Sequence, residues 1–312
     1  MKEISHYETS LFSPERDGFY GAYYPLRTPS HKAMILMLGD AVDDALALAG
    51  VRWLHEQQIA VLAMAPAKKD YGHHNLPLER FGTALRWLKV RGHKQIGIFG
   101  ISTTGMLALI AASYYPEISL TIAASPSDFV MEGFYRGHRD GATEWPGDGE
   151  STVCWQGNPL PYLPFAHRHP AFAQCMKENA RATHNLVASR ALFDDAERQH
   201  PLREEACIKI ERICGKIVCI GAEDDAMWDT CRYIRRMQTR LAEHPHTCTL
   251  EALLYTHGTH FVLPQSMVQN LLPVGSSFFI GLCFQAGRQH PGLCKTTRLD
   301  IDQHLRRVLA QW

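Results

Sequence analysis

Six short apolar runs separated by segments of helical period are the feature that most limits how this chain can fold. The runs are AMILMLG (33–39), AVLAMAP (60–66), QIGIFG (95–100), SLTIAAS (119–125), KIVCIG (216–221) and LEALLY (250–255). Nearly continuous apolar strands that alternate with helices are typical of a parallel sheet covered on both faces. The segments ALALAGVRWLHEQ and PLERFGTALRWLKVRG have apolar residues three and four positions apart, as crossover helices do. The pattern predicts an α/β fold with a mostly parallel, doubly wound sheet.

The alternation of strands and helices stops between residues 126 and 200. This stretch contains GHRDGATEWPGDGESTVCWQGNPLPYLPF, which is rich in glycine, proline and aromatic residues and is too long for an ordinary loop. We expect residues 1–312 to form a single domain, with a core of about 20–125 and 200–312 and a lid or cap insertion at about 126–200. The aromatic residues of the insertion could line a substrate pocket or could pack as a structural loop.

Composition argues against several classes of protein. Lys+Arg and Asp+Glu both number 32, so the zero net charge gives no reason to expect binding to nucleic acid or to an anionic membrane. No apolar run reaches the roughly 18 residues of a membrane span, and MKEISHYETS lacks the apolar core of a signal peptide. We therefore expect a soluble, cytoplasmic protein without a membrane partner.

The cysteines and histidines give no sign of a disulfide framework or a metal site. The nine cysteines are scattered, odd in number and without CxxC pairs, so we expect reduced thiols. The histidine-containing stretches HPHTC, YGHHN and HRH lack the ligand spacing of zinc sites. We expect neither a metal ion nor a cofactor.

The segment GIFGISTTG (97–105) has a serine, Ser102, at the point where a strand becomes a helix. Small neighbours allow the sharp turn of a nucleophile elbow, G-x-S-x-G, which exposes the serine hydroxyl above the sheet in α/β-hydrolases. Gly100 fits this pattern, whereas Thr104 occupies the second glycine position and Gly105 comes one residue late. On its own, Ser102 could be an ordinary turn or N-cap serine.

Partners for Ser102 follow two later strands in the order that an α/β-hydrolase triad requires, serine, then acid, then histidine. KIVCIG leads into AEDDAMWD, which offers Asp224 and Asp225, and LEALLY leads into THGTHF, which offers His257 and His260. Spacing alone does not choose within either pair. In such a triad the histidine takes the proton of the serine, and the carboxylate orients the histidine.

An acyl-transfer reaction also needs two backbone N–H donors for the oxyanion. The elbow predicts Thr103 as one donor and the loop after MILMLG, at Asp40 or Ala41, as the other. A carboxylate at position 40 would repel an oxyanion unless its side chain points away.

Four segments resemble the catalytic domain shared by acyl-CoA thioester hydrolases and bile acid-CoA:amino acid N-acyltransferase, a dienelactone-hydrolase-like branch of the α/β-hydrolase superfamily. They are IGIFGISTTGMLALIAASYYPEI, SPSDFVMEGF, IERICGKIVCIGAEDDAMW and YTHGTHFV, and the resemblance extends over about residues 20–310. Family members carry a segment similar to GAEDDAMW, and the resemblance implies that Asp225 is the triad acid. The final glycine-histidine pair of the family corresponds to His260, with Thr259 in place of glycine.

The chain also departs from the family in two ways. Animal members place an immunoglobulin-like β-domain before the catalytic domain, whereas only about 20 residues precede the first hydrolase-like strands here. Members that transfer an acyl group to amino acids use cysteine as the nucleophile, whereas this chain has Ser102.

We therefore expect a serine hydrolase that cleaves a small-molecule acyl ester or an acyl-CoA thioester with Ser102, Asp225 and His260. Acyl transfer to an amine or alcohol is one alternative. A non-catalytic scaffold that binds a small ligand is the other, suggested by Thr104, Thr259 and Asp40.

Overall fold

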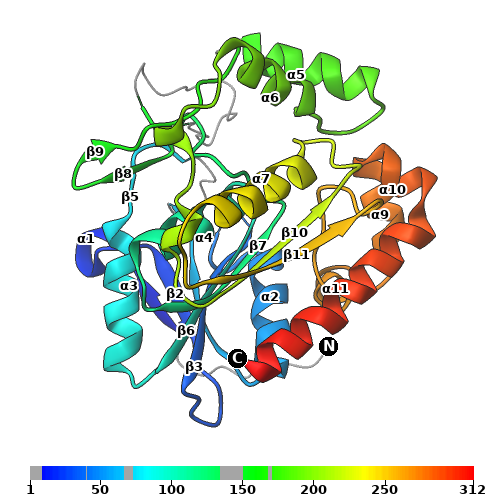
Figure 1. Cartoon of the computed structure of the whole chain (residues 1–312). Helices are drawn as coiled ribbons and strands as arrows, with labels where there is room; N and C mark the ends of the chain where they lie inside the picture. Colours follow the sequence, from blue (N-terminus) through cyan, green and yellow to red (C-terminus); the bar gives the residue numbers. More distant parts are fainter. Residues whose placement is uncertain (1–8, 40, 67–72, 134–149, 168–170) are drawn as a thin grey trace.

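The computed structural model describes residues 9–39, 41–66, 73–133, 150–167 and 171–312. Within them, one eight-stranded sheet has the order β1-β2-β4-β3-β6-β7-β10-β11 (Figure 1). The strands are β1 (Ser10–Phe12), β2 (Gly21–Tyr24), β3 (Lys32–Met37), β4 (Ala60–Met64), β6 (Gln95–Ile101), β7 (Ile118–Ala124), β10 (Lys216–Ala222) and β11 (Thr249–Tyr255).

In this sheet, β4, β3, β6, β7, β10 and β11 are parallel to one another, and β1 and β2 add an antiparallel edge. The six apolar runs of the sequence are these six parallel strands, so the prediction of a mostly parallel, doubly wound sheet is confirmed. The periodicity missed β1 and β2 because each is only three or four residues long.

Helices cover both faces of the sheet (Figure 1). One face packs on α3, α4 and α7, and the other packs on α2, α8 and α11. The helices are α1 (Pro14–Asp17), α2 (Ala45–Glu56), α3 (Glu79–Val90), α4 (Thr103–Tyr114), α5 (Ala171–Ala182), α6 (Arg190–Gln199), α7 (Thr230–Glu243), α8 (Gln265–Leu271), α9 (Ser276–Cys283), α10 (Gln285–Gln289) and α11 (Pro291–Gln311), with 3₁₀ turns η1 (Glu204–Ala206) and η2 (Ile210–Arg212).

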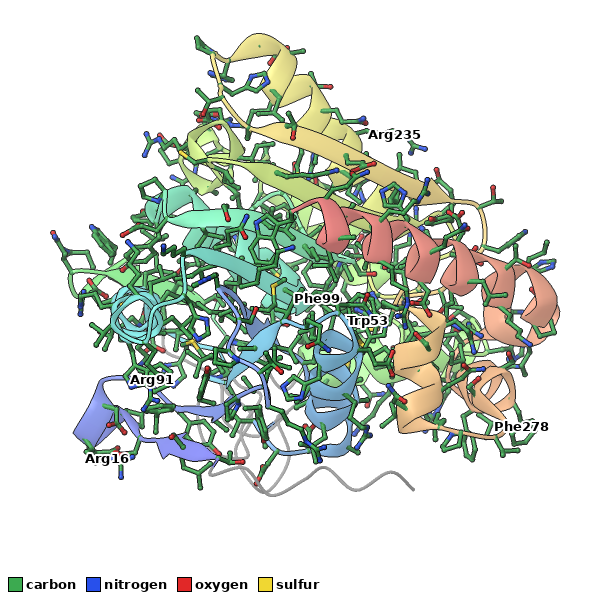
Figure 2. All side chains as sticks on the ribbon, turned by 90° about the horizontal axis from the view of Figure 1, so that it is seen from below. Arg16, Trp53, Arg91, Phe99, Arg235 and Phe278 are labelled. Carbon is green, nitrogen blue, oxygen red and sulfur yellow. The ribbon has the colours of Figure 1, made fainter. Side chains whose placement is uncertain are left out.

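Central strands bury side chains on both faces, which explains their unbroken apolar sequence. In β3, Ile35 contributes to the core under α3 and α4, whereas Met34 and Leu36 contribute to the core under α2 and α11. Figure 2 shows Trp53 of α2 beside Phe99 of β6 in the interior; both are fully buried, with ring centroids 6.5 Å apart. A sheet buried on two sides is a rigid base for the loops at its carboxyl edge.

The described part of residues 126–200 contains elements outside the main sheet. A small second sheet has the order β5-β8-β9, in which β8 (Val153–Trp155) pairs with both β5 (Leu76–Pro77) and β9 (Asn158–Pro159). Helices α5 and α6 lie together at the top of Figure 1, above α7. The division into a core and a lid insertion stays a prediction.

Two further observations concern the sequence-based expectations. All nine cysteines are free thiols. In the described ranges, no single helix is both long and apolar enough to cross a membrane, and α8 and α9 pass that test only as a pair bent by 90°.

Candidate active site

Ser102 lies between the end of β6 and the start of α4, in a strained backbone conformation. Its φ of 63° and ψ of −131° are unusual for a residue with a side chain. The Ser102 N–H donates to the Ala124 carbonyl oxygen of the neighbouring strand β7 over 2.8 Å. A strained residue between a strand and a helix is the geometry expected of a nucleophile elbow, and the role of Ser102 as a nucleophile stays a prediction.

Two glycines make the elbow possible. A Cβ atom at Gly100 would lie 2.1 Å from the backbone oxygen of Thr104, and one at Gly105 would lie 2.8 Å from the Ala124 oxygen. Real Cβ atoms do not approach backbone oxygens this closely, so both positions require glycine. Gly105, although one residue late for the motif, supplies the close approach between α4 and β7.

Thr104, which replaces the second motif glycine, is buried and hydrogen-bonded. Its Oγ1 is 2.7 Å from the carbonyl oxygens of both Met37 and Ile101. The hydroxyl has a single proton, so it donates to one of these oxygens at a time. The hydroxyl oxygen accepts from the Ile101 N–H over 3.0 Å. Threonine therefore stabilises the elbow and links it to the end of β3.

Asp225 and His260 form a buried pair at the same carboxyl edge of the sheet. Asp225 follows β10 and His260 follows β11, and His260 Nδ1 lies 2.8 Å and 3.0 Å from the two oxygens of Asp225. Asp225 also accepts from the Met227 N–H over 2.8 Å and from the Thr230 hydroxyl over 2.5 Å. The acid is thus fixed on several sides.

The other nitrogen of His260, Nε2, is buried and has no hydrogen-bond partner among the described residues. A neutral histidine that donates Nδ1–H to a carboxylate presents Nε2 as an acceptor. The structure has no hydrogen bond between Ser102 Oγ and this nitrogen, and such contacts are often long before substrate binds. His260 is therefore oriented by Asp225 and has a nitrogen available to accept a proton.

The second pair, Asp224 and His257, has a different arrangement. Asp224 accepts from the Gly258 N–H over 3.0 Å and from the Thr259 N–H over 2.8 Å, and it lies 3.1 Å from His257 Nδ1. The ring of His257 stacks on that of His290 with 4.1 Å between centroids. Asp224 thus holds the loop that carries His260, whereas only Asp225 contacts His260 itself.

The backbone conformation of Thr259 explains why glycine suits the position before His260. Its φ is 63°, in the left-handed region that favours glycine, and its side chain is fully buried. Its Oγ1 accepts from the Phe261 N–H over 3.1 Å. A local hydrogen bond of this kind helps a threonine remain in the strained conformation.

The backbone N–H groups expected to bind the oxyanion differ in their hydrogen bonding. Thr103 is the first residue of α4, where a backbone N–H has no acceptor within its own helix. The N–H of Ala41 donates to Asp44 Oδ2 over 3.1 Å, and Asp40 lies outside the described residues. Ala41 would have to exchange Asp44 for the oxyanion, so its role and that of Asp40 stay predictions.

Ser125 and Trp228 support the site and were not singled out from the sequence. Ser125 directly follows β7 and has a φ of 45°, and its hydroxyl donates to the His260 backbone oxygen over 3.0 Å. Trp228 donates its Nε1–H to the Ser125 oxygen over 3.1 Å and packs edge-on against the His260 ring at 4.8 Å. The position of Ser125 at the end of the run SLTIAAS was the available sequence signal.

Comparison with known proteins shows which family the chain belongs to. Residues 76–267, more than half of the chain, match the family described as "BAAT / Acyl-CoA thioester hydrolase C terminal". The chain belongs to this family. The resemblance noted in the sequence is therefore confirmed.

Solved structures of other proteins have the same fold as this chain. The α/β-hydrolase MGS-M1 from a Medee basin deep-sea metagenome library is similar with a TM-score of 0.52 and 12% identity, over 97% of this chain and 98% of that one. A candidate dienelactone hydrolase from Klebsiella pneumoniae subsp. pneumoniae MGH 78578 has a TM-score of 0.51 and 10% identity, with the same coverage. No curated protein sequence matches the chain. The fold is that of an α/β-hydrolase, and the family supports hydrolysis of ester or thioester bonds.

Three buried cysteines are not activated as alternative nucleophiles. Burial raises the pKa of Cys219 and Cys231 to about 12 and that of Cys294 to about 11. A thiol attacks as its thiolate, so these three cysteines are inert at neutral pH. Ser102 is the candidate nucleophile at the elbow.

Proposed function

We propose that this protein is a serine hydrolase that cleaves an acyl ester or an acyl-CoA thioester through an acyl-Ser102 intermediate. The observation that carries the proposal is the buried Asp225–His260 pair, with Nδ1 to Oδ2 at 2.8 Å, on the same sheet edge as the strained Ser102. Family membership supports an acyl substrate with an oxygen or sulfur leaving group.

The proposed reaction has two halves. Ser102 Oγ attacks the acyl carbonyl carbon while His260 Nε2 takes the hydroxyl proton, and Asp225 stabilises the resulting imidazolium. The tetrahedral oxyanion accepts from the Thr103 N–H, with Asp40 or Ala41 as the proposed second donor. His260 then protonates the departing alcohol or thiol, which leaves an ester on Ser102. A water molecule, activated by His260, hydrolyses that ester and restores the enzyme.

The substrate is proposed to be a small acyl ester or acyl-CoA molecule, and the reaction as written needs no metal or cofactor. Hydrolysis is favoured over transfer because the proposed nucleophile is serine, whereas the members of the family that transfer acyl groups to amino acids use cysteine. Cytoplasmic location and the absence of a membrane partner, which the sequence led us to expect, stay predictions.

The test combines covalent labelling with turnover. We expect a fluorophosphonate probe to add once to the wild-type chain and not to Ser102→Ala, as measured by intact-mass spectrometry. Against p-nitrophenyl esters and acyl-CoAs of graded length, Ser102→Ala should lose about a million-fold in kcat, because triad members act as a unit. Circular dichroism should show the variant folded.

Other outcomes separate the alternatives. Conjugates formed with added glycine, taurine or a small alcohol, in place of free acid, would indicate an acyltransferase. A folded protein that neither reacts with the probe nor turns over any substrate would indicate a binding scaffold and would contradict the proposal.

A further inference from the structure

The loop that carries Asp225 is held by the start of helix α6, a segment of the predicted insertion. The backbone N–H groups of Ser189 and Arg190 both donate to the Ala226 oxygen, over 3.0 Å and 3.1 Å. The Ser189 hydroxyl donates to the Met227 oxygen over 2.7 Å. Three hydrogen bonds thus connect the first turn of α6 to the two residues that follow the acid.

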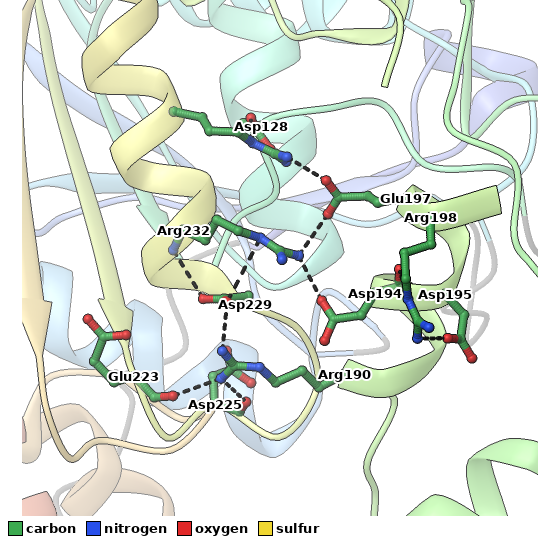
Figure 3. A network of polar contacts seen from close by, with 11 residues as sticks. Asp128, Arg190, Asp194, Asp195, Glu197, Arg198, Glu223, Asp225, Asp229 and Arg232 are labelled. Atoms are coloured by element: carbon green, nitrogen blue, oxygen red, sulfur yellow. Dashed lines mark hydrogen bonds and ion pairs between the residues drawn. The ribbon is translucent and has the colours of Figure 1, made fainter. Parts of the chain in front are cut away.

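The side chain of Arg190 closes the same loop from another side (Figure 3). Its Nη1 donates to the backbone oxygens of Glu223, over 2.7 Å, and of Asp225, over 3.2 Å. Its Nη2 pairs with Asp229 Oδ2 over 2.7 Å. One guanidinium therefore joins the start, the catalytic residue and the end of the loop between β10 and α7.

Helix α6, which begins at Arg190, is held in place by contacts with α7 and with Trp228. Farther along α6, Asp194 and Glu197 accept from Arg232 of α7 over 2.8 Å and 2.9 Å (Figure 3). On the apolar side of α6, Phe193 packs edge-on against Trp228, with 5.2 Å between ring centroids. These contacts explain how a helix from the insertion can hold a loop of the core in place.

We propose that Arg190 is a positioning residue for the triad acid, through which helix α6 keeps Asp225 at its hydrogen-bonding distance from His260. The inference rests on the proposed function. Among the described residues, Arg190 makes no hydrogen bond or ion pair with His260 or Ser102, so it acts through the backbone of the acid loop. Displacement of a catalytic group by about 1 Å can lower a rate about 100-fold.

The experiment compares Arg190→Met and Arg190→Lys in the full chain with Arg198→Met. Arg198 is a matched control because it lies on the same helix and pairs with Asp195, away from the acid loop. For p-nitrophenyl ester hydrolysis, Arg190→Met should lower kcat about 10- to 100-fold and change KM less than about threefold. Arg190→Lys should recover part of kcat, since an ammonium can still donate to the carbonyls, and Arg198→Met should match wild type.

A spectroscopic readout tests the positioning without requiring turnover. Proton NMR in water detects the strongly deshielded proton shared by a histidine Nδ1 and a carboxylate, and Asp225→Asn assigns that signal. We expect the signal to shift or broaden in Arg190→Met and to stay unchanged in Arg198→Met. Thermal melting monitors folding in every variant.

The outcomes distinguish this inference from the proposed function. If wild type shows no turnover and no labelling, the proposed function fails, while the NMR comparison still decides whether Arg190 positions Asp225. An Arg190→Met variant with wild-type kcat and an unchanged signal would overturn the inference. A loss of activity that only follows a loss of folded protein, or a change confined to KM, would overturn it as well.

Discussion

At the scale of single residues, Thr104 shows how a departure from a sequence motif can be compatible with its geometry. The position usually taken by glycine has a side chain whose hydroxyl contacts Met37 and Ile101 and whose methyl group is buried. The close approach that the motif needs is supplied at Gly105 instead. The hydroxyl of Thr104 is therefore part of the packing between β3 and the elbow.

Substitution of Thr104 by valine should lower the free energy of unfolding by about 1–3 kcal/mol. Valine has nearly the same shape, but it leaves buried backbone groups of Met37 and Ile101 without their partner. Thr104→Ser, which keeps the hydroxyl, is the control and should lose about 1 kcal/mol or less. Urea denaturation followed by circular dichroism measures both, and a valine variant as stable as wild type would contradict this account.

At the scale of elements, the two adjacent carboxylates of the loop after β10 have different hydrogen-bond partners. Asp225 contacts His260, whereas Asp224 accepts backbone N–H groups from the loop that carries His260. The loops after β10 and β11 are therefore held together by Asp224, and Asp225 joins them in the proposed triad.

This division predicts different losses for the two alanine variants. Asp225→Ala should lower kcat about 10,000-fold, as removal of a triad acid does elsewhere. Asp224→Ala should lower the free energy of unfolding by about 1–3 kcal/mol, because two backbone donors lose their acceptor, and should lower kcat far less. Asp224→Asn keeps an acceptor oxygen and should be milder. Steady-state kinetics with urea denaturation checks this, and equal kcat losses for the two alanine variants would speak against separate roles.

The sequence predicted the elements with regular patterns and missed those without them. The six parallel strands were visible because burial on both faces leaves unbroken apolar runs, and the candidate elbow and its candidate partners were sought at the ends of these runs. The choice of Asp225 over Asp224 needed the resemblance, because spacing does not show which carboxylate points at His260. The contacts of Arg190 were not predictable, since a loop-to-helix contact between an insertion and the core has no sequence period.

At the scale of the whole molecule, one buried histidine links stability to pH. His73 is fully buried, and burial lowers its pKa from 6.5 to about 3. The folded protein therefore keeps His73 neutral, whereas the unfolded chain takes up a proton below about pH 6.5. The stability that depends on the neutral form is complete above pH 6.5 and is lost as the pH falls toward 3.

We expect the free energy of unfolding of wild type to fall more steeply with decreasing pH than that of His73→Gln. The difference in slope should approach about 1.4 kcal/mol per pH unit between pH 6 and 4, because one proton is involved. His246→Gln, at an exposed position, should keep the wild-type slope. Urea denaturation at several pH values measures the slopes, and parallel curves for wild type and His73→Gln would refute the assignment.

The contact between α6 and the acid loop has a consequence for how this fold diversifies. Most of its acceptors are backbone oxygens, at residues 223, 225, 226 and 227, which every amino acid provides. Substitutions at these four positions leave the backbone acceptors in place, whereas Asp229 is needed for its ion pair with Arg190. A different insertion needs a Ser-Arg pair at its entry, together with contacts that hold its helix as Arg232 holds α6, to make the same connection. We therefore expect that insertions with these features can be exchanged between related chains during evolution, or grafted by design, while the proposed triad acid stays in place.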